Sequence, residues 1–179
     1  MANPQNGFNT QHGTLTSKTT GANSIDSLLD GIQWAPGGNG VTALTYSFPW
    51  ARSASAYWAS NPNYSPDNEP GSAFALTPMQ QQAVRNALAT WSSVANISFA
   101  EVTETASNVG DLRFTWTNFN LPDAAAWAYF PNDYYARGGD VWLSSTNLSK
   151  TDLSWQPGQS VFKTLMHEIG HALGLKHPF

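Results

Sequence analysis

The stretch HEIGHALGLKHP, residues 167–178, holds three of the four histidines of this 179-residue chain. His167 and His171 are four residues apart, so on a helix their imidazoles project from nearly the same face. Gly174 can adopt the left-handed conformation that ends a helix, and His177 then follows on the far side of the turn. The spacing therefore predicts that ring nitrogens of His167, His171 and His177 reach one metal ion.

The composition narrows the metal to one held by nitrogen and oxygen ligands, because the chain has no cysteine. Three neutral imidazoles leave the fourth position of a tetrahedral zinc open, which is typical of catalytic sites. The pair His167 and His171 with Glu168 between them is weak support alone, since such matches also occur in helices that bind no metal. Gly174 and His177 extend the match to five fixed positions, so we predict a zinc site.

Two long helices are predicted, and the second carries this motif. The first begins after Thr77, which has the capping-box spacing with Gln80 and is followed by Pro78 at the first helical position. The second spans residues 159–173 and has an inward-facing apolar stripe, which consists of Val161, Phe162, Leu165, Met166, Ile169 and Leu173.

Five stretches rich in β-forming residues, each bounded by Gly, Pro, Asn or Asp, are predicted strands. They are residues 41–48, 97–102, 112–117, 125–130 and 140–144. The order is strand, helix, four strands, helix. This order predicts an α+β fold in which a twisted mixed five-stranded sheet packs against two long helices.

The polar beginning of the chain is set apart from the rest. Residues 1–23 are rich in Gly and Thr and have no hydrophobic period, so they are predicted to form a flexible N-terminal arm that leaves His12 in solvent. Ser24 is predicted to cap a short helical turn that ends near Gly31. Residues 24–179 are predicted to form one compact unit, which we expect to be a monomer.

Charge and hydrophobicity argue against two classes of partner. The net charge of −4 and the pI near 5.4 disfavour binding to nucleic acid or to an anionic membrane, since no basic stretch could neutralise phosphates. The opening residues contain no apolar core of a Sec-type signal, and no stretch approaches the length of a membrane span. We therefore expect neither nucleic acid nor membrane as a partner.

The motif in residues 167–178 resembles that of the metzincin endopeptidases, and further matches resemble the serralysin branch of secreted bacterial proteases. These matches are SIDSLLDGIQW, LTYSF, AYFP and GGDVWL. The resemblance implies the upper subdomain of a metzincin, with zinc on the three histidines and Glu168 as general base. It implies a protein or peptide substrate that pairs with an edge strand formed by Ala126, Trp127, Ala128 and Tyr129. It also implies an extracellular protein, here without a Sec-type N-terminal signal.

Parts of the family's pattern are not found after the motif. The family has a Met-containing turn, a tyrosine near the metal and Gly-rich calcium repeats beyond it, whereas Met1, Met79 and Met166 all precede His167. We therefore expect the chain to be the N-terminal part of the catalytic domain, with weak activity by itself. Calcium as a second cofactor is possible within the family but is not supported by this segment.

Two other classes of function stay open at this point. A zinc-bearing but inactive module could bind a protein partner through the exposed strand edge, although such a module would not need Glu168. A sugar-binding domain could use the aromatic residues of 127–135, but it would not need the histidine string. Asp140, which follows Gly138 and Gly139, most simply begins a strand, with calcium ligation as the less favoured interpretation.

Overall fold

The computed structural model describes residues 12–50, 64–105 and 108–178. Within this part of the chain, the main sheet has six strands, five of which follow the order β5-β3-β6-β8-β7, with the short β4 paired to β6. Their bounds are β3 Thr42–Ser47, β4 Ala73–Phe74, β5 Ile97–Glu101, β6 Leu112–Thr117, β7 Ala126–Ala128 and β8 Asp140–Ser144. β3, β5, β6 and β8 run parallel, and β4 and β7 are antiparallel to their neighbours. The predicted five-stranded mixed sheet is confirmed, with β4 as an addition.

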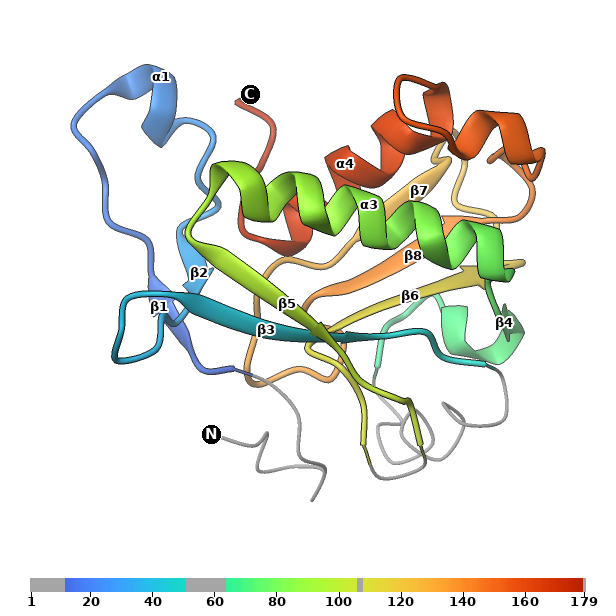
Figure 1. Cartoon of the computed structure of the whole chain (residues 1–179), viewed down its shortest axis with the longest axis horizontal. Coiled ribbons are helices and arrows are strands. Elements are labelled where there is room, and N and C mark those ends of the chain that lie inside the picture. Colours follow the sequence, from blue (N-terminus) through green and yellow to red (C-terminus); the bar gives the residue numbers. More distant parts are fainter. Residues whose placement is uncertain (1–11, 51–63, 106–107, 179) are drawn as a thin grey trace.

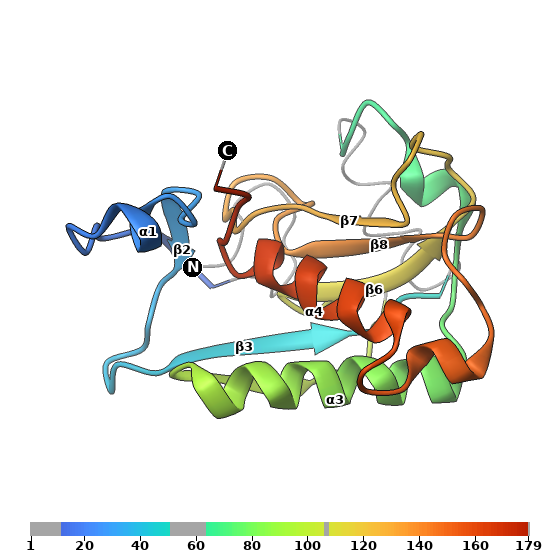
Figure 2. The same cartoon turned by 90° about the horizontal axis from the view of Figure 1, so that it is seen from above.

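Two long helices, α3 (Pro78–Val94) and α4 (Ser160–Ala172), cover one face of this sheet (Figures 1 and 2). The capping box that starts α3 is present, because Thr77 accepts a hydrogen bond from the Gln80 amide and Gln80 Oε1 accepts one from the Thr77 amide at 2.9 Å. Gln80 Oε1 also accepts a hydrogen bond from Trp116 Nε1 at 3.0 Å, which ties the helix start to the sheet. The α+β fold class is therefore confirmed.

The opposite face of the sheet is covered by loops and carries a second, smaller core. Its buried apolar members are Tyr64, Ala73, Val109, Ala136 and Trp142. Beside them, Asp140 accepts hydrogen bonds from Arg113 at both oxygens and from the Tyr64 hydroxyl. Because Asp140 is buried with both oxygens used inside the protein, this geometry favours the interpretation of Asp140 as a structural residue.

A small unit of β1 (Thr14–Thr16), α1 (Asn23–Asp26) and β2 (Ile32–Trp34) stands beside the sheet. β1 pairs antiparallel with β2, and the Thr14 amide donates to Asp133 Oδ2 at 3.1 Å. The flexible arm predicted over residues 1–23 therefore differs from the structure at residues 14–16, which form a paired strand. The His12 amide likewise donates to Asp111 Oδ1 at 2.9 Å, so this residue contacts the domain. Residues 1–11 of the predicted arm lie outside the described residues.

No helix among the described residues is both long and apolar enough to cross a membrane.

Candidate active site

Helix α4 presents its histidines on one side because its other side is apolar. Val161, Phe162, Leu165, Ile169 and Ala172 are buried in the main core. His167 is left exposed and His171 half-buried, one turn apart along the helix. The helix ends at Ala172, and Gly174 just beyond it has a φ of +104°, the left-handed conformation that the sequence predicts there.

The three predicted ligand histidines come together in the structure. The Nε2 atom of His167 lies 3.0 Å from that of His171 and 3.0 Å from that of His177. Tetrahedral zinc with nitrogen bonds of ~2.0–2.1 Å would place its ligand atoms about 3.3 Å apart. The spacing of the imidazoles is therefore close to what one zinc ion requires.

Proton positions give a second test of whether these residues fit a metal. His171 Nδ1 lies 2.6 Å from the Leu175 carbonyl oxygen, an acceptor, so Nδ1 carries the proton and Nε2 of the neutral ring has a lone pair. His167 Nε2 bears either a proton or a lone pair, and so cannot both donate to His171 and accept from His177. Hydrogen bonding thus satisfies only one of the two 3.0 Å contacts, whereas a shared cation satisfies both.

The protonation of His167 is also suited to a metal ligand. Partial burial lowers the pKa of His167, and the nearby charges of His171, His177 and Lys163 lower it further. A neutral imidazole is the form that binds a metal. The donor set therefore fits zinc.

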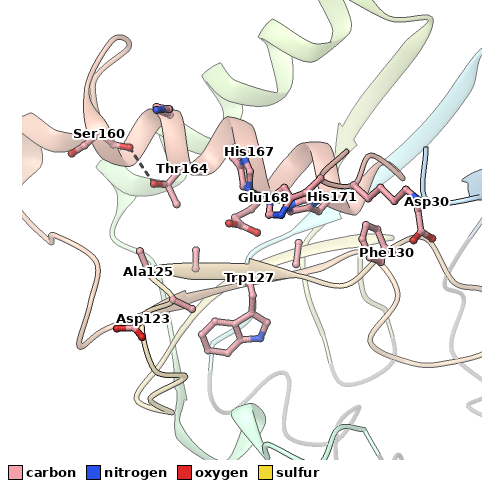
Figure 3. Close-up of a pocket in the computed structure, with 16 residues that line it drawn as sticks. Asp30, Asp123, Ala125, Trp127, Phe130, Ser160, Thr164, His167, Glu168 and His171 are labelled. Carbon is pink, nitrogen blue, oxygen red and sulfur yellow. Dashed lines mark hydrogen bonds between the residues drawn. The ribbon is translucent and has the colours of Figure 1, made fainter. Parts of the chain in front are cut away.

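Glu168 lies beside the histidines and points toward β7 across the cleft (Figure 3). Its side chain is buried, and burial raises the pKa of Glu168 to about 7. Among the residues that the structure describes, none donates a hydrogen bond to this carboxylate. A buried acceptor without a partner inside the protein is poised to take a proton or a hydrogen bond from a molecule in the cleft.

The cleft has a volume of about 900 Å³ and runs between α4 and β7. Small residues of 124–126 and Ala128 form one wall, while Ser160, Thr164 and the histidines form the other. β7 is the last strand of the sheet, so one side of its backbone is without a neighbouring strand in the described sheet. The cleft therefore combines the histidine cluster with a strand edge.

The predicted substrate residues divide between the two sides of β7. The Tyr129 amide donates to the Asp140 carbonyl and the Ser144 amide to the Ala125 carbonyl, so odd-numbered residues bond to β8. In an antiparallel ladder the alternate residues then direct their amide and carbonyl groups outward, which here are Ala126 and Ala128. The side chain of Trp127 points away from the cleft (Figure 3), and Trp127 and Tyr129 both donate to Glu69.

Two neighbours of the site were not predicted from the sequence. Phe130 packs edge-on against the His171 ring, with ring centres 5.7 Å apart. Trp34, from β2, donates from Nε1 to the Ala172 carbonyl at 2.8 Å. Both residues lie within stretches that match the serralysins, but only the tertiary structure places their side chains beside the histidine helix.

Comparison with known proteins agrees with this geometry. A sequence model of the peptidase M10 family, the matrixins, matches residues 61–179. The chain belongs to the matrixin family. This matrixin chain contains the whole histidine string within the matched region, and its resemblance to the serralysins is confirmed by similar proteins.

Three such relatives of the matrixin chain are bacterial. It is 36% identical to metallopeptidase AprA of Pseudomonas marginalis over 145 residues, which cover 79% of this chain and 28% of that protein. It is 29% identical to metalloprotease AprA of Pseudomonas entomophila over 154 residues, which cover 84% of this chain and 29% of that protein. It is 30% identical to serralysin of Proteus mirabilis over 148 residues, which cover 75% of this chain and 27% of that protein. The chain thus spans less than a third of the length of these relatives.

Proposed function

We propose that this chain carries the catalytic centre of a zinc-dependent endopeptidase. One observation supports this most directly: three imidazole Nε2 atoms converge beside the buried Glu168, across a cleft from a strand edge. Membership of the matrixins and similarity to metallopeptidases called AprA and serralysin support the same function.

His167, His171 and His177 would hold the metal, each through Nε2. Zinc supplies Lewis acidity when bound, which makes water a nucleophile near neutral pH and polarises a carbonyl. Glu168 would accept the proton of the attacking water on its carboxylate and deliver it to the leaving amine. Burial of Glu168 raises its pKa to about 7, so its carboxylate is basic enough to take a proton within the cleft near neutral pH.

The substrate would bind as an added strand on β7. The outward amide and carbonyl groups of Ala126 and Ala128 offer main-chain hydrogen bonds, so recognition would be largely independent of the peptide's sequence. Antiparallel pairing is slightly the more stable arrangement. It would direct the residues after the scissile bond toward Ser160 and Thr164, and those before it toward Phe130.

The test is to measure zinc content and hydrolysis of unfolded casein with the same preparation. One zinc per chain and peptide-bond cleavage are expected. Replacement of His177 by Ala should lower zinc affinity sharply, because two imidazoles do not fix the geometry. Zinc binding without cleavage would favour the alternative, a zinc-loaded module that binds a partner through β7. Equal zinc affinity in the His177→Ala protein would contradict the three-ligand site.

Extracellular location, export without a Sec-type signal and a monomeric state stay predictions from the sequence. The same holds for calcium as a second cofactor, since the proposed reaction involves only the histidine site.

A further inference from the structure

A segment far from the zinc motif in sequence lies alongside the turn that carries the third histidine. We call this segment, residues 28–34, the strap. The strap and residues 174–176 run antiparallel and form a β-bridge between Leu29 and Leu175. Two hydrogen bonds make this bridge: the Asp30 amide donates to the Gly174 carbonyl at 2.9 Å, and the Lys176 amide donates to the Leu28 carbonyl at 2.7 Å. In Figures 1 and 2 the C-terminal end accordingly lies close to α1 and β2.

Leu175 joins the strap to the histidines. Because Asp30 and Lys176 make the bonds on either side of the bridge, the amide and carbonyl groups of Leu175 point away from the strap. The amide donates to the Gly170 carbonyl at 2.9 Å, and the carbonyl lies 2.6 Å from His171 Nδ1. The peptide that orients His171 is therefore held between α4 and the strap.

The strap also approaches the helix end closely at two further points. A Cβ at Gly174 would lie 2.6 Å from the Ile32 carbonyl oxygen, so the turn passes the strap without room for a side chain. Trp34 is 3% exposed, and its Nε1 donates to the Ala172 carbonyl at 2.8 Å. This carbonyl is among the last four of the helix, which have no partner within the helix itself.

The strap has its own fixed position relative to the sheet. Its residues from Ile32 to Trp34 form β2, which pairs with β1, and β1 is tied to the domain through Asp133. Gly31 has a φ of +105° with open space around its missing side chain, so the local chain path depends on glycine conformation rather than on packing. The position of the strap is thus fixed by its own contacts with the rest of the domain.

We propose that the strap is a positioning element for zinc, which sets the metal affinity without supplying a ligand. This inference rests on the proposed function, because it takes zinc as the metal. His177 lies beyond the end of α4, and only the turn of residues 173–176 connects it to the helix. Without the strap, this turn would be free to move before zinc binds and would have to be ordered on binding. The loss of its conformational entropy would lower the zinc affinity.

The first test compares two glycines that both have a positive φ and open space where a side chain would lie. Gly31→Ala strains the strap, whereas Gly21→Ala introduces the same left-handed strain outside it, at φ +83° and also in open space. Zinc affinity is measured by competition with a chromogenic chelator, and the melting temperature of each metal-free protein is recorded. Gly31→Ala is expected to lower zinc affinity about tenfold, the lower end for loss of outer-shell support. Gly21→Ala should bind zinc as the unchanged chain does, at a similar cost in melting temperature.

The second test removes one hydrogen bond from an aromatic side chain. Trp34→Phe keeps a ring but loses the donor to Ala172. Trp155→Phe is the matched control, because Trp155 is 1% exposed and donates to the Ser149 carbonyl at 3.2 Å, away from the histidines. Zinc affinity should fall about threefold or more in Trp34→Phe, on the scale of one hydrogen bond, and stay unchanged in Trp155→Phe. Equal affinities in the two proteins would overturn the role of Trp34.

A double-mutant cycle separates positioning from general destabilisation. Gly31→Ala is combined with His177→Ala, and the loss of zinc affinity is compared with that in the three-histidine protein. If the strap acts mainly through His177, Gly31→Ala should cost much less in the His177→Ala background. An equal loss in both backgrounds would overturn the role of His177 as the ligand that the strap positions. Failure of the unchanged chain to bind zinc would instead overturn the proposed function and the inference with it.

Discussion

Two buried carboxylates on opposite sides of the sheet differ in the hydrogen bonds that they accept from the protein. Asp140, in the loop-covered face, accepts hydrogen bonds from Arg113 at both oxygens and from Tyr64. Glu168, in the cleft, has no such donor among the described residues. Burial raises the pKa of both groups, but at Asp140 the charge of Arg113 opposes the rise. A buried carboxylate is costly unless it is paired and hydrogen-bonded, so the carboxylate without a donor is best explained by chemistry.

Glu168→Gln should give the largest change in activity. The amide keeps the shape of the side chain but cannot accept a proton, so peptide hydrolysis should fall by about 10²–10⁴-fold. The free energy of unfolding should be unchanged or higher, because no internal hydrogen bond is lost and a buried carboxylate is removed. Hydrolysis of a fluorogenic peptide measures the loss of activity, and urea unfolding measures the free energy of unfolding. Full activity would assign the proton transfer to another group.

Asp140→Asn should give the opposite pattern. The substitution leaves Arg113 buried beside a neutral partner, and breaking a buried ion pair in this way costs about 3–5 kcal/mol of unfolding free energy. Urea unfolding at pH 7 measures the loss, and zinc affinity of the protein that stays folded should be unchanged. A marginal loss of stability together with a large loss of zinc affinity would show that the two regions are not separate.

The comparison also shows which parts of the molecule the sequence could predict. The histidine string and the capping box that starts α3 were predicted because local spacing determines both: His167, His171 and Gly174 share one helix and its turn. The strand β1 was not predicted, since Thr14–Thr16 has no apolar alternation and is ordered by β2 and Asp133. Trp34 was missed for the same reason, because its bond to Ala172 joins residues 138 positions apart. Long-range contacts of this kind leave no local pattern.

The structure adds the backbone orientation of the predicted substrate strand, whose binding of a peptide stays a prediction. Trp127 and Tyr129 alternate with Ala126 and Ala128, but only the pairing with β8 shows which pair directs its backbone toward the cleft. The sequence-based prediction named all four residues without separating them by the direction of their backbone groups.

Ala128→Pro should therefore weaken substrate binding while leaving the metal site intact. Proline removes the outward amide of Ala128, and one main-chain hydrogen bond of about 1.5 kcal/mol corresponds to a rise in KM of about tenfold. Ala128→Ser is the control, because it keeps the amide and a small side chain. Steady-state kinetics and zinc affinity are measured on both proteins. An unchanged KM in a folded Ala128→Pro protein would mean that the peptide does not pair with β7.

The smallest effect is expected at Glu101, a carboxylate that is paired like Asp140 but lies at the surface. Arg85 Nε donates to Glu101 Oε2 at 2.7 Å, and this hydrogen bond lowers the pKa of Glu101 below its usual value. A lowered pKa in the folded protein means that the pair stabilises the fold above the unfolded pKa of ~4.3 and that this contribution is lost as the pH falls through the folded value. Because both side chains are about a third exposed, solvent screens the pair, and the contribution should be only about 0.2–1 kcal/mol.

Arg85→Met tests this last expectation, since it keeps an unbranched side chain near Phe48 without the charge. The substitution should lower the free energy of unfolding slightly at pH 7, and the difference should shrink as the pH falls below the unfolded pKa of ~4.3 and through the lowered pKa of the folded protein. High salt at pH 7 should reduce the difference as well. A loss that stays the same as the pH falls would show that the Arg85 guanidinium, 5.2 Å from the Phe48 ring centre, acts through packing instead of through its charge pair. Pairing at the surface would then contribute nothing measurable, and burial alone would account for the contrast between Asp140 and Glu101.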